Sequence, residues 1–264
     1  NHHFVEYASR AWKVWRMNGP CSFLVENYSG GPCRFRAAKS YPRVLGVTPA
    51  SVDVVDYVAE NEEEATIIAK QLLAYFQGPI EEFTFSDQGQ LQEMMPDDRR
   101  YTYEVRDIIG TISDADTFLE LRNQYGKSIV TGFIRIEGKP FALLASDCKQ
   151  LGGAIDSESA EKAGEFISIC NDHQLPILVL ADTPGFMVGP ASEQGGAVRR
   201  MSSLLKQGAN LSVPLVAIFL RNGYGLGSQA LVGGSLHNLV YTAAWPTVEL
   251  GAMGVESAVT VGYK

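Results

Sequence analysis

Two glycine-rich turns are the parts of this sequence whose residue types and spacing could do chemistry. One occupies residues 183–186 (TPGF) and the other residues 223–227 (GYGLG), and each follows a run of apolar residues. Glycine tolerates positive φ at little cost, so the backbone N–H groups of such turns can point toward a ligand. A helix that begins just after the turn adds positive potential. The pattern indicates a hole of main-chain donors for a developing oxyanion, as enolate chemistry on a thioester requires.

The second turn also fits a dinucleotide-binding fingerprint. Residues 225–230 read G-x-G-x-x-A, and Glu249 lies about twenty residues further on, where an acidic ribose ligand is expected. Four residues, 221–224, delay this turn after the strand, and Pro246 interrupts the segment that would carry the acidic residue. We therefore do not expect NAD binding.

The other standard motifs are incomplete. Gly126-Lys127-Ser128 resembles the end of a phosphate-binding loop, but Leu121 stands where its first glycine belongs. No serine has glycine two residues before and two residues after it, so the nucleophile elbow is absent. His173 lacks metal-ligand spacing and lies at an expected helix C-terminus, where the helix dipole stabilises it. The sequence thus predicts no metal site and no evident side-chain acid, base or nucleophile.

Buried parallel strands are expected to position the two turns. Residues 177–180 and 215–220 are continuous apolar runs, which are typical of strands covered on both faces. About 30 residues with one amphipathic helix separate them, the length of a βαβ crossover. Two further strands are expected near residues 239–244 and 247–252, with a break at Trp245-Pro246.

The preceding segment predicts a β-β-α unit. Residues 128–136 and 141–146 read as the two strands of a hairpin around a tight turn. After two glycines a helix is expected, with Asp156 or Ser157 as its N-cap. Its apolar face comprises Ala160, Ala163, Phe166, Ile167 and Cys170.

The first hundred residues carry fewer signals. Asn61, followed by three glutamates, predicts the start of a helix that Gly78-Pro79 ends. Residues 79–100 are polar and acidic, which favours a linker and a domain boundary there. Short helices are expected over residues 97–112 and over residues 114–122, the second capped by Asp114 or Asp116.

Composition limits the class of protein. Of 264 residues, 45% are hydrophobic and 20% charged, as in ordinary globular proteins, and the net charge of −8 gives no support to nucleic-acid or anionic-membrane binding. No apolar run is long enough to span a bilayer. Four cysteines without C-x-x-C spacing favour free thiols in a reducing compartment. The expected location is the cytoplasm, or the mitochondrial matrix in a eukaryote.

Several motifs in order resemble a known family. LPILVLADTPGF, VRRMSSLL, VPLVAIFLRNGYGLGSQAL and AAWPTVELGAMG closely resemble the carboxyltransferase (beta) subunit or domain of biotin-dependent acyl-CoA carboxylases. Propionyl-, acetyl-, methylcrotonyl- and long-chain acyl-CoA carboxylases share this unit. Upstream, GKSIVTGFIRIEGKPFALLAS and LGGAIDSESAEKAGEF continue the similarity. It covers roughly residues 41–264 and is strongest from residue 129 onward.

The resemblance implies a fold and a reaction. The fold is an α/β, crotonase-like (ClpP/crotonase) spiral of β-β-α units, mostly the C-terminal half-domain. Residues 1–78 would be a remnant of the N-terminal half-domain, residues 79–100 the linker, and residues 101–264 the C-terminal half-domain. Carboxybiotin on a carrier domain would give its carboxyl group to the α-carbon of an acyl-CoA, and the biotin ureido anion could take the α-proton.

The resemblance also implies partners. They are a biotin carboxylase, a biotin carboxyl carrier and further copies of the chain, arranged as dimers in a hexameric ring. No nucleic acid or membrane partner is implied.

Site residues are carried over position by position. The family turn usually reads Tyr-Gly-Gly-Ala, and here residues 224–227 read YGLG, so the Leu226 and Gly227 N–H groups are the expected donors to the biotin ureido oxygen. Phe186 would form a wall of the biotin or acyl pocket, although a purely structural core phenylalanine is equally compatible with the sequence. The resemblance implies this set of pocket residues: Gly152, Gly153, Ala154, Thr183, Pro184, Gly185, Phe186, Tyr224, Gly225, Ser228 and Gln229.

Two departures leave alternatives open. The leucine at position 226, where the family has glycine, keeps an N–H but adds a side chain beside the expected biotin. The N-terminal half-domain, which in the family carries most of the coenzyme A site and a second oxyanion hole, is largely missing, and we do not assign that hole to Gly30-Gly31. The implied active site lies between half-domains of two subunits. The alternatives are a biotin-independent acyl-CoA decarboxylase on the same fold and a non-catalytic scaffold in a carboxylase complex.

Overall fold

The computed structural model describes residues 14–15, 22–25, 35–38, 55–96, 98–194, 196–234 and 241–263. The chain forms two compact units. The first comprises Asn1–Gly78 with Leu121–Tyr125, and the second comprises Pro79–Glu120 with Gly126–Lys264. The two turns of interest lie in the second unit.

The described residues of the first unit form a small antiparallel sheet and one helix. The sheet has the order β1 (Val14–Trp15), β2 (Ser22–Val25), β3 (Phe35–Ala38). The helix α2 spans Glu62–Tyr75, and the Asn61 side chain accepts from the Glu64 N–H at 2.9 Å, so the predicted N-cap is confirmed. Three glutamates in its first turn suit the positive end of the helix dipole. Its buried residues are Ala65, Ala69, Leu72 and Tyr75.

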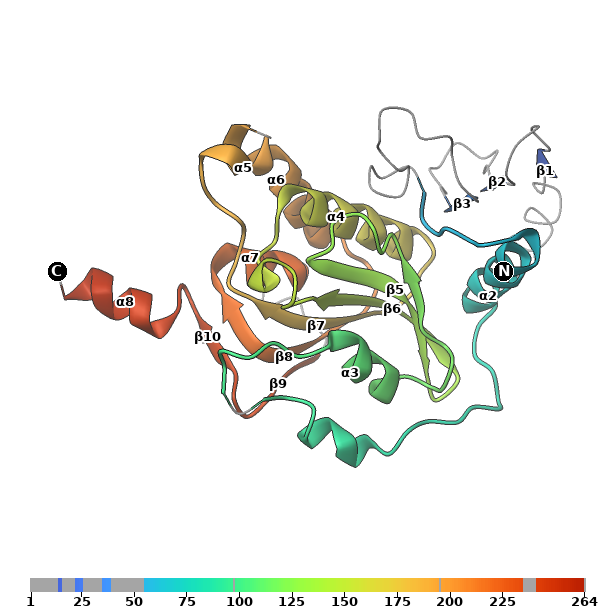
Figure 1. The fold of residues 1–264 in the computed structure, drawn as a ribbon, viewed down its shortest axis with the longest axis horizontal. Helices are drawn as coiled ribbons and strands as arrows, with labels where there is room; N and C mark the ends of the chain where they lie inside the picture. Colours follow the sequence, from blue (N-terminus) through green and yellow to red (C-terminus); the bar gives the residue numbers. More distant parts are fainter. Residues whose placement is uncertain are drawn as a thin grey trace. The chain divides into compact units, whose positions relative to one another are not determined.

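A seven-stranded mixed sheet forms the second unit (Figure 1). The strands follow the order β10-β8-β7-β6-β5-β4, and β9 also pairs with β8. Hairpin β5–β6 is antiparallel and the β6–β7 pair is parallel. The β7–β8 pair is also parallel, as the two continuous apolar runs predicted. The strand bounds are β4 Leu119–Leu121, β5 Ile129–Ile136, β6 Lys139–Ser146, β7 Ile177–Thr183, β8 Leu215–Tyr224, β9 Tyr241–Ala244 and β10 Glu249–Gly251.

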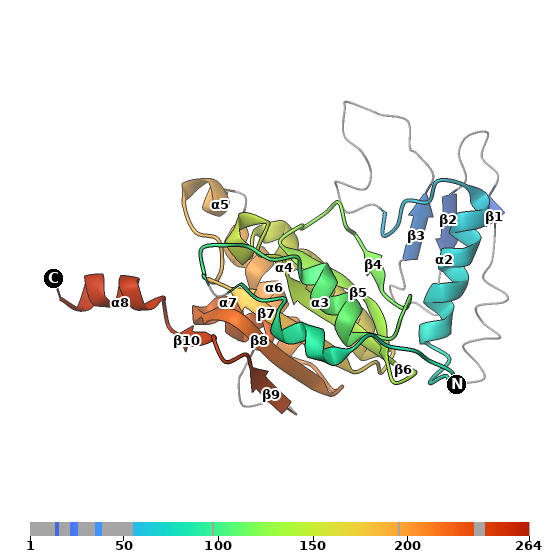
Figure 2. The same ribbon diagram turned by 60° about the horizontal axis from the view of Figure 1, so that its bottom comes forward.

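Helices cover both faces of this sheet. Helix α3 (Val105–Ile112) packs on one face, and Figure 2 shows it in front of the strands. Helix α4 (Ser157–Asp172) packs on the other face, where Phe166 lies 5.4 Å from Phe133 between ring centroids, and α6 (Ala197–Ala209) packs against α4. Alternate strand residues face α3, and these form a buried core: Val130, Ile134, Leu143, Ala145, Leu178, Leu180 and Leu220.

The predicted β-β-α unit and the crossover after it are confirmed. The Asp156 side chain accepts from the Ser159 N–H at 2.8 Å and caps α4. The short helix α5 (Pro190–Gln194) and α6 then connect β7 to β8. At Gly164 in α4, an added Cβ would lie 3.4 Å from the Leu204 backbone, so the small residue lets α4 and α6 pack closely.

The segment of residues 79–100 runs along the second unit. The Ile80 N–H donates to the Gly138 carbonyl at 3.0 Å, and the Ala115 N–H donates to the Thr84 carbonyl at 2.7 Å. A 3-10 helix, η2 (Gln88–Gln92), follows, and the Gln88 side chain donates to the Thr111 carbonyl. The predicted linker is therefore held against the larger unit by hydrogen bonds along its length, and its assignment as a boundary stays a prediction.

The helix predicted over residues 114–122 is wrong. The Asp114 carboxylate accepts from the Glu137 N–H at 3.0 Å and from the Gly138 N–H at 2.7 Å, so it caps the β5–β6 turn instead of a helix. Asp116 has φ 58°, and residues 119–121 join the sheet as β4. Side-chain hydrogen bonds to a distant turn replaced the local capping that the sequence indicated.

Beyond residue 234 the described chain continues the sheet at β8. Strand β9 pairs in parallel with residues 216–219 of β8, and β10 pairs in parallel with residues 222–224. The break predicted at Trp245-Pro246 separates them, and the Trp245 N–H donates to the Phe219 carbonyl at 2.8 Å. Helix α8 (Val255–Gly262) follows and has no buried residue.

Two of the four cysteines lie in the described part of the chain. Cys148 and Cys170 are both buried free thiols, as predicted, and burial raises the pKa of each. Cys21 and Cys33 fall outside the described residues. Among the residues that the structure describes, no helix has the length and apolar character needed to cross a bilayer.

His173 gives the fold a dependence on pH. It lies at the C-terminal end of α4, as predicted, and burial lowers the pKa of its imidazole below the ordinary value of 6.5 despite the opposing charge of Asp172. Because the unfolded chain then binds more protons, the free energy of unfolding is highest above pH 6.5. It decreases as the pH falls from 6.5 toward the lowered pKa of His173 in the folded state. We expect the urea midpoint of wild type to fall more on acidification below pH 6.5 than the midpoint of His173→Gln, which lacks the titrating imidazole. An equal or smaller fall in wild type would contradict this assignment.

Candidate functional site

The turn after β7 is held by its own threonine. Thr183 is fully buried, and its hydroxyl oxygen accepts from the Gly185 N–H at 3.1 Å. Gly185 has φ 119°, a conformation that glycine adopts at little cost. Pro184 is exposed and Phe186 is half-buried. The TPGF turn therefore has one defined shape, set by a local hydrogen bond and one glycine.

A second loop packs directly on this turn. It begins with the 3-10 helix η3 (Leu151–Gly153), and a Cβ on Gly153 would lie 2.3 Å from the Asp182 carbonyl oxygen. The Ile155 N–H donates to the Gly185 carbonyl at 2.9 Å, and the Met187 N–H donates to the Ile155 carbonyl at 2.8 Å. Gly152 and Ala154 flank this contact. The predicted pocket loop and the TPGF turn are thus joined through their backbones.

The turn after β8 packs against the TPGF turn. Helix α7 (Gly225–Leu231) begins directly after Tyr224, and Gly225 has φ 60°. A Cβ on Gly227 would lie 2.7 Å from the Cα and carbonyl carbon of Gly185 and from the Phe186 nitrogen. Only glycine permits this backbone approach without a shift. The structure therefore brings together the three segments that the sequence singled out.

The two predicted donors lie in the first turn of α7. First-turn N–H groups have no acceptor within their own helix. In the described part of the chain, neither the Leu226 nor the Gly227 N–H donates to a backbone acceptor outside α7, and the N-cap residue Tyr224 makes no capping hydrogen bond with its side chain. Leu226 is 55% exposed, so its side chain points toward solvent. Gly227 itself is buried, and the role of the two N–H groups as donors to a ligand stays a prediction.

Two other predicted residues have different surroundings. The Ser228 hydroxyl is buried and donates to the Gly225 carbonyl at 3.0 Å, so it stabilises the first turn of α7. Gln229 is exposed on the same helix. Their assignment to the acyl pocket stays a prediction.

A bulge in the sheet directs β8 into the turn. Ala181 pairs with Phe219 and Thr183 pairs with Gly223, so an advance of two residues along β7 corresponds to four residues along β8. The Asp182 carboxylate fills the gap, accepting from the Asn222 N–H at 3.0 Å and from its side-chain amide at 2.9 Å. A side chain thus replaces the missing ladder bonds, and such bulges change the direction of a strand.

Asp182 is also the centre of a buried charge cluster. Its carboxylate is fully buried, lies 3.2 Å from Arg221 Nη2 and accepts from the Tyr103 hydroxyl at 2.8 Å. The Arg221 guanidinium lies over the Tyr103 ring, 5.3 Å from its centroid. Burial, and then the Asp182 charge, raise the pKa of Tyr103 above its ordinary value, so this phenol stays a neutral donor.

Sequence reasoning did not identify this cluster as part of the site. Asp182 opens the DTPGF motif and Arg221 opens the four residues that delay the second turn, so both had a local signal. Tyr103 precedes Asp182 by 79 residues, and no spacing rule connects them.

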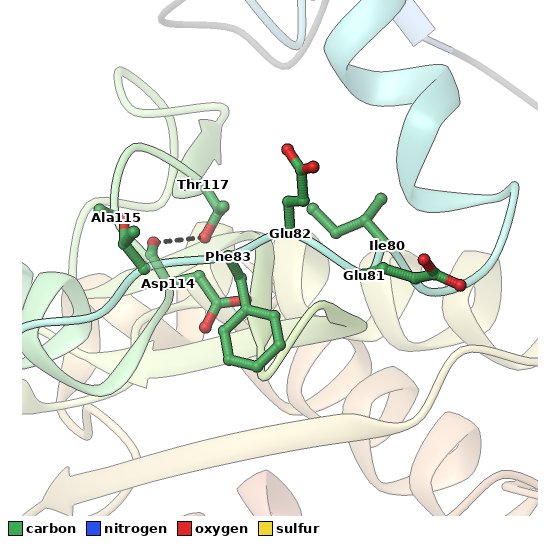
Figure 3. A pocket seen from close by; sticks show the side chains of 8 residues that line it. Ile80, Glu81, Glu82, Phe83, Asp114, Ala115 and Thr117 are labelled. Carbon is green, nitrogen blue, oxygen red and sulfur yellow. Dashed lines mark hydrogen bonds between the residues drawn. The ribbon is translucent and has the colours of Figure 1, made fainter.

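A separate open pocket lies at the other end of the sheet, near the amino ends of the parallel strands. It has a volume of about 540 Å³ and is lined by residues 80–84 together with Asp114, Ala115 and Thr117 (Figure 3). Asp114 binds the turn before β6, which is the amino end of the parallel strands. The glycine-rich turns follow the carboxyl ends of β7 and β8, where ligands bind in open α/β sheets. This pocket is therefore distinct from the candidate site.

Removal of the Asp182 carboxylate tests the cluster. We expect Asp182→Ala to lower the free energy of unfolding by about 3–5 kcal/mol, because it leaves the Arg221 guanidinium buried without its counter-ion. Urea denaturation monitored by tryptophan fluorescence measures the change. The matched control is Asp98→Ala, which breaks the exposed pair with Arg100 and should change the midpoint little. Equal effects of the two substitutions would contradict a stabilising role for the buried pair.

Comparison with known proteins places this geometry in a family. The carboxyl transferase domain matches residues 51–264. The methylmalonyl-CoA carboxyltransferase 12S subunit of Propionibacterium freudenreichii subsp. shermanii is 32% identical over 219 residues, which cover 80% of this chain and 41% of the relative. The chain spans 40% to 45% of the length of the curated relatives it matches.

Solved structures agree in fold. A single-chain, multi-domain long-chain acyl-CoA carboxylase superposes with a TM-score of 0.80 at 46% identity, over 82% of this chain and 22% of that chain. The transcarboxylase 12S hexamer, solved with methylmalonyl-CoA bound, gives a TM-score of 0.74 at 29% identity, over 81% and 43%. The fold is thus the crotonase-like α/β fold that the sequence predicted, and the chain belongs to the carboxyl transferase domain family.

Proposed function

We propose that this chain is the carboxyltransferase component of a biotin-dependent acyl-CoA carboxylase. One observation carries the proposal: three glycine-rich segments meet through their backbones, beside two first-turn N–H groups that donate to no backbone acceptor outside α7 in the described part of the chain. A site without evident acid or base side chains can still stabilise a developing oxyanion through fixed main-chain donors.

The residues present fit biotin at this site. The Leu226 and Gly227 N–H groups would hold the ureido oxygen, and the start of α7 adds positive potential there. The TPGF turn and residues 152–154 would wall the biotin or acyl pocket beside them. When bound, carboxybiotin supplies the carboxyl group, and its ureido nitrogen can take the α-proton of the acyl-CoA. The protein contributes position and electrostatic stabilisation rather than a proton-transfer group.

The proposal extends to partners. The resemblance to the family implies that the coenzyme A site lies between half-domains of two subunits, and this arrangement is part of the proposal. A biotin carboxylase and a biotinylated carrier would load and deliver the carboxyl group. The transcarboxylase 12S core assembles as a hexamer, and a hexameric ring of the present chain is part of the proposal, as is a cytoplasmic location.

Transfer of labelled carboxyl groups tests the function. The full protein is assembled with a biotin carboxylase and biotinylated carrier and given ATP, labelled bicarbonate and acyl-CoA esters of increasing chain length. Acid-stable label in the acyl-CoA is the expected result. Turnover of malonyl- or methylmalonyl-CoA without biotin would instead favour a decarboxylase. Full activity after deletion of residues 223–230 would favour a scaffold.

Proline substitution tests the donor assignment. Gly227→Pro removes one N–H and also distorts the turn, because a Cβ at this position would lie 2.7 Å from Gly185. It should lower the rate of carboxyl transfer by about 100-fold or more, since loss of one oxyanion donor alone has an effect of that order. Ser257→Pro is the matched control, since it also places proline at the third residue of a short helix, the exposed α8. We expect the control to transfer at the wild-type rate. Wild-type product formation by Gly227→Pro would falsify the donor assignment.

A further inference from the structure

Arg99 joins the bulge in β8 to a neighbouring strand. Its guanidinium donates from Nη2 to the Asn222 side-chain oxygen at 2.7 Å, and Nη1 forms an ion pair with Glu249 on β10. The two charged side chains are 34% and 36% exposed, so the pair is partly shielded from water. Arg99 therefore contacts the same residue, Asn222, that the Asp182 carboxylate holds from within.

Glu249 connects this pair to the start of α7. Its second carboxylate oxygen accepts from the Tyr224 hydroxyl. Parallel pairing puts Glu249 opposite Asn222 and Gly251 opposite Tyr224, so β10 runs beside the residues that lead into the turn. A Cβ on Gly254 would lie 3.6 Å from Tyr224 Cε2, which shows that the ring also packs on the chain after β10. Both the ring and the hydroxyl of Tyr224 are thus held by the β10 segment.

Arg221 holds the backbone around Arg99 from the interior side. Its Nη1 donates to the Arg99 carbonyl at 3.1 Å and to the Tyr101 carbonyl at 2.7 Å. The backbone of residues 99–101 is therefore bound to a buried ion pair, while the Arg99 side chain reaches outward to β10. The contacts form one continuous path from Asp182 through Arg221, Arg99 and Glu249 to Tyr224.

We propose that Arg99 and Glu249 are positioning residues for carboxyl transfer, which act through the Tyr224 hydroxyl to fix the turn that presents the Leu226 and Gly227 N–H groups. The inference rests on the proposed function. Tyr224 is the residue immediately before α7, so rotation of its backbone would re-aim both donors. Donors must be fixed before the reaction to stabilise its transition state. A hydrogen bond to a carboxylate, itself held by a guanidinium, is a strong way to fix them.

Four variants of the full protein, each assembled with the biotin carboxylase and carrier, test this role. Arg99→Met removes the ion pair, Glu249→Gln removes its negative charge, and Tyr224→Phe removes only the hydroxyl. Arg99→Lys keeps the charge but not the two-pronged contact, because lysine has no planar fork of donors. The matched control is Arg100→Met, since the adjacent Arg100 forms its ion pair with Asp98 and its side chain is 87% exposed.

The kinetic readout separates positioning from substrate binding. We expect Arg99→Met and Tyr224→Phe each to lower kcat by about tenfold, with the KM for acyl-CoA within about twofold of wild type, because a small misplacement of catalytic groups acts on the transition state. Arg99→Lys should recover part of the loss, and Arg100→Met should match wild type. The double variant Arg99→Met/Tyr224→Phe should lose little more than either single variant, because both act on one turn.

A second readout needs no reaction. Amide hydrogen exchange of the peptide that covers residues 223–231 should be faster in Arg99→Met and Tyr224→Phe than in wild type, and unchanged in Arg100→Met. If Arg99→Met proves unstable, Tyr224→Phe still gives this readout, because it removes only one oxygen atom and should disturb the fold little.

The two proposals fail in different ways. Faster exchange together with no carboxyl transfer by the wild-type complex would sink the proposed function and leave the positioning contact in place. Normal transfer by wild type, with wild-type kcat in both Arg99→Met and Tyr224→Phe, would overturn the positioning role. Fully additive losses in the double variant would overturn it as well.

Discussion

The buried ion pair between Asp182 and Arg221 is the constraint on which the site depends. Asp182 is the next-to-last residue of β7, and its carboxylate replaces the ladder bonds that the bulge in β8 removes. A carboxylate without exposure to water is stable only with a counter-ion and hydrogen-bond donors, and Arg221, Tyr103 and Asn222 supply them. Satisfying one charge therefore fixes where β8 turns and where α7 begins.

Local signals predicted most elements of the second unit. The apolar runs of β7 and β8, the hairpin β5–β6 and the Asp156 cap of α4 each depend on neighbouring residues, and the structure confirms them. The helix predicted around Asp114 was wrong because the Asp114 carboxylate accepts from the Glu137 and Gly138 N–H groups, 23 and 24 residues away. A capping residue in sequence cannot reveal which backbone it caps when a distant turn competes for it.

The candidate site divides in the same way. Glycine spacing pointed to the TPGF and GYGLG turns and to residues 152–154, and the structure brings these segments together. Tyr103 and Arg99 had no signal, because their partners lie 79 and 123 residues further along the chain. Glu249, considered first as a ribose ligand, instead accepts from Tyr224. The glycine pattern was enough to suggest the donor turn, whereas the charged residues that support it could be found only from the fold.

The contact between Gly185 and Gly227 has a mechanical consequence. Backbone meets backbone there, and a Cβ on Gly227 would lie 2.7 Å from its neighbours. No rotamer lies between the two turns to absorb a displacement, because neither residue has a side chain. A shift at the end of β7 would therefore reach the first turn of α7 through direct backbone contact, with no side chain between them to take it up.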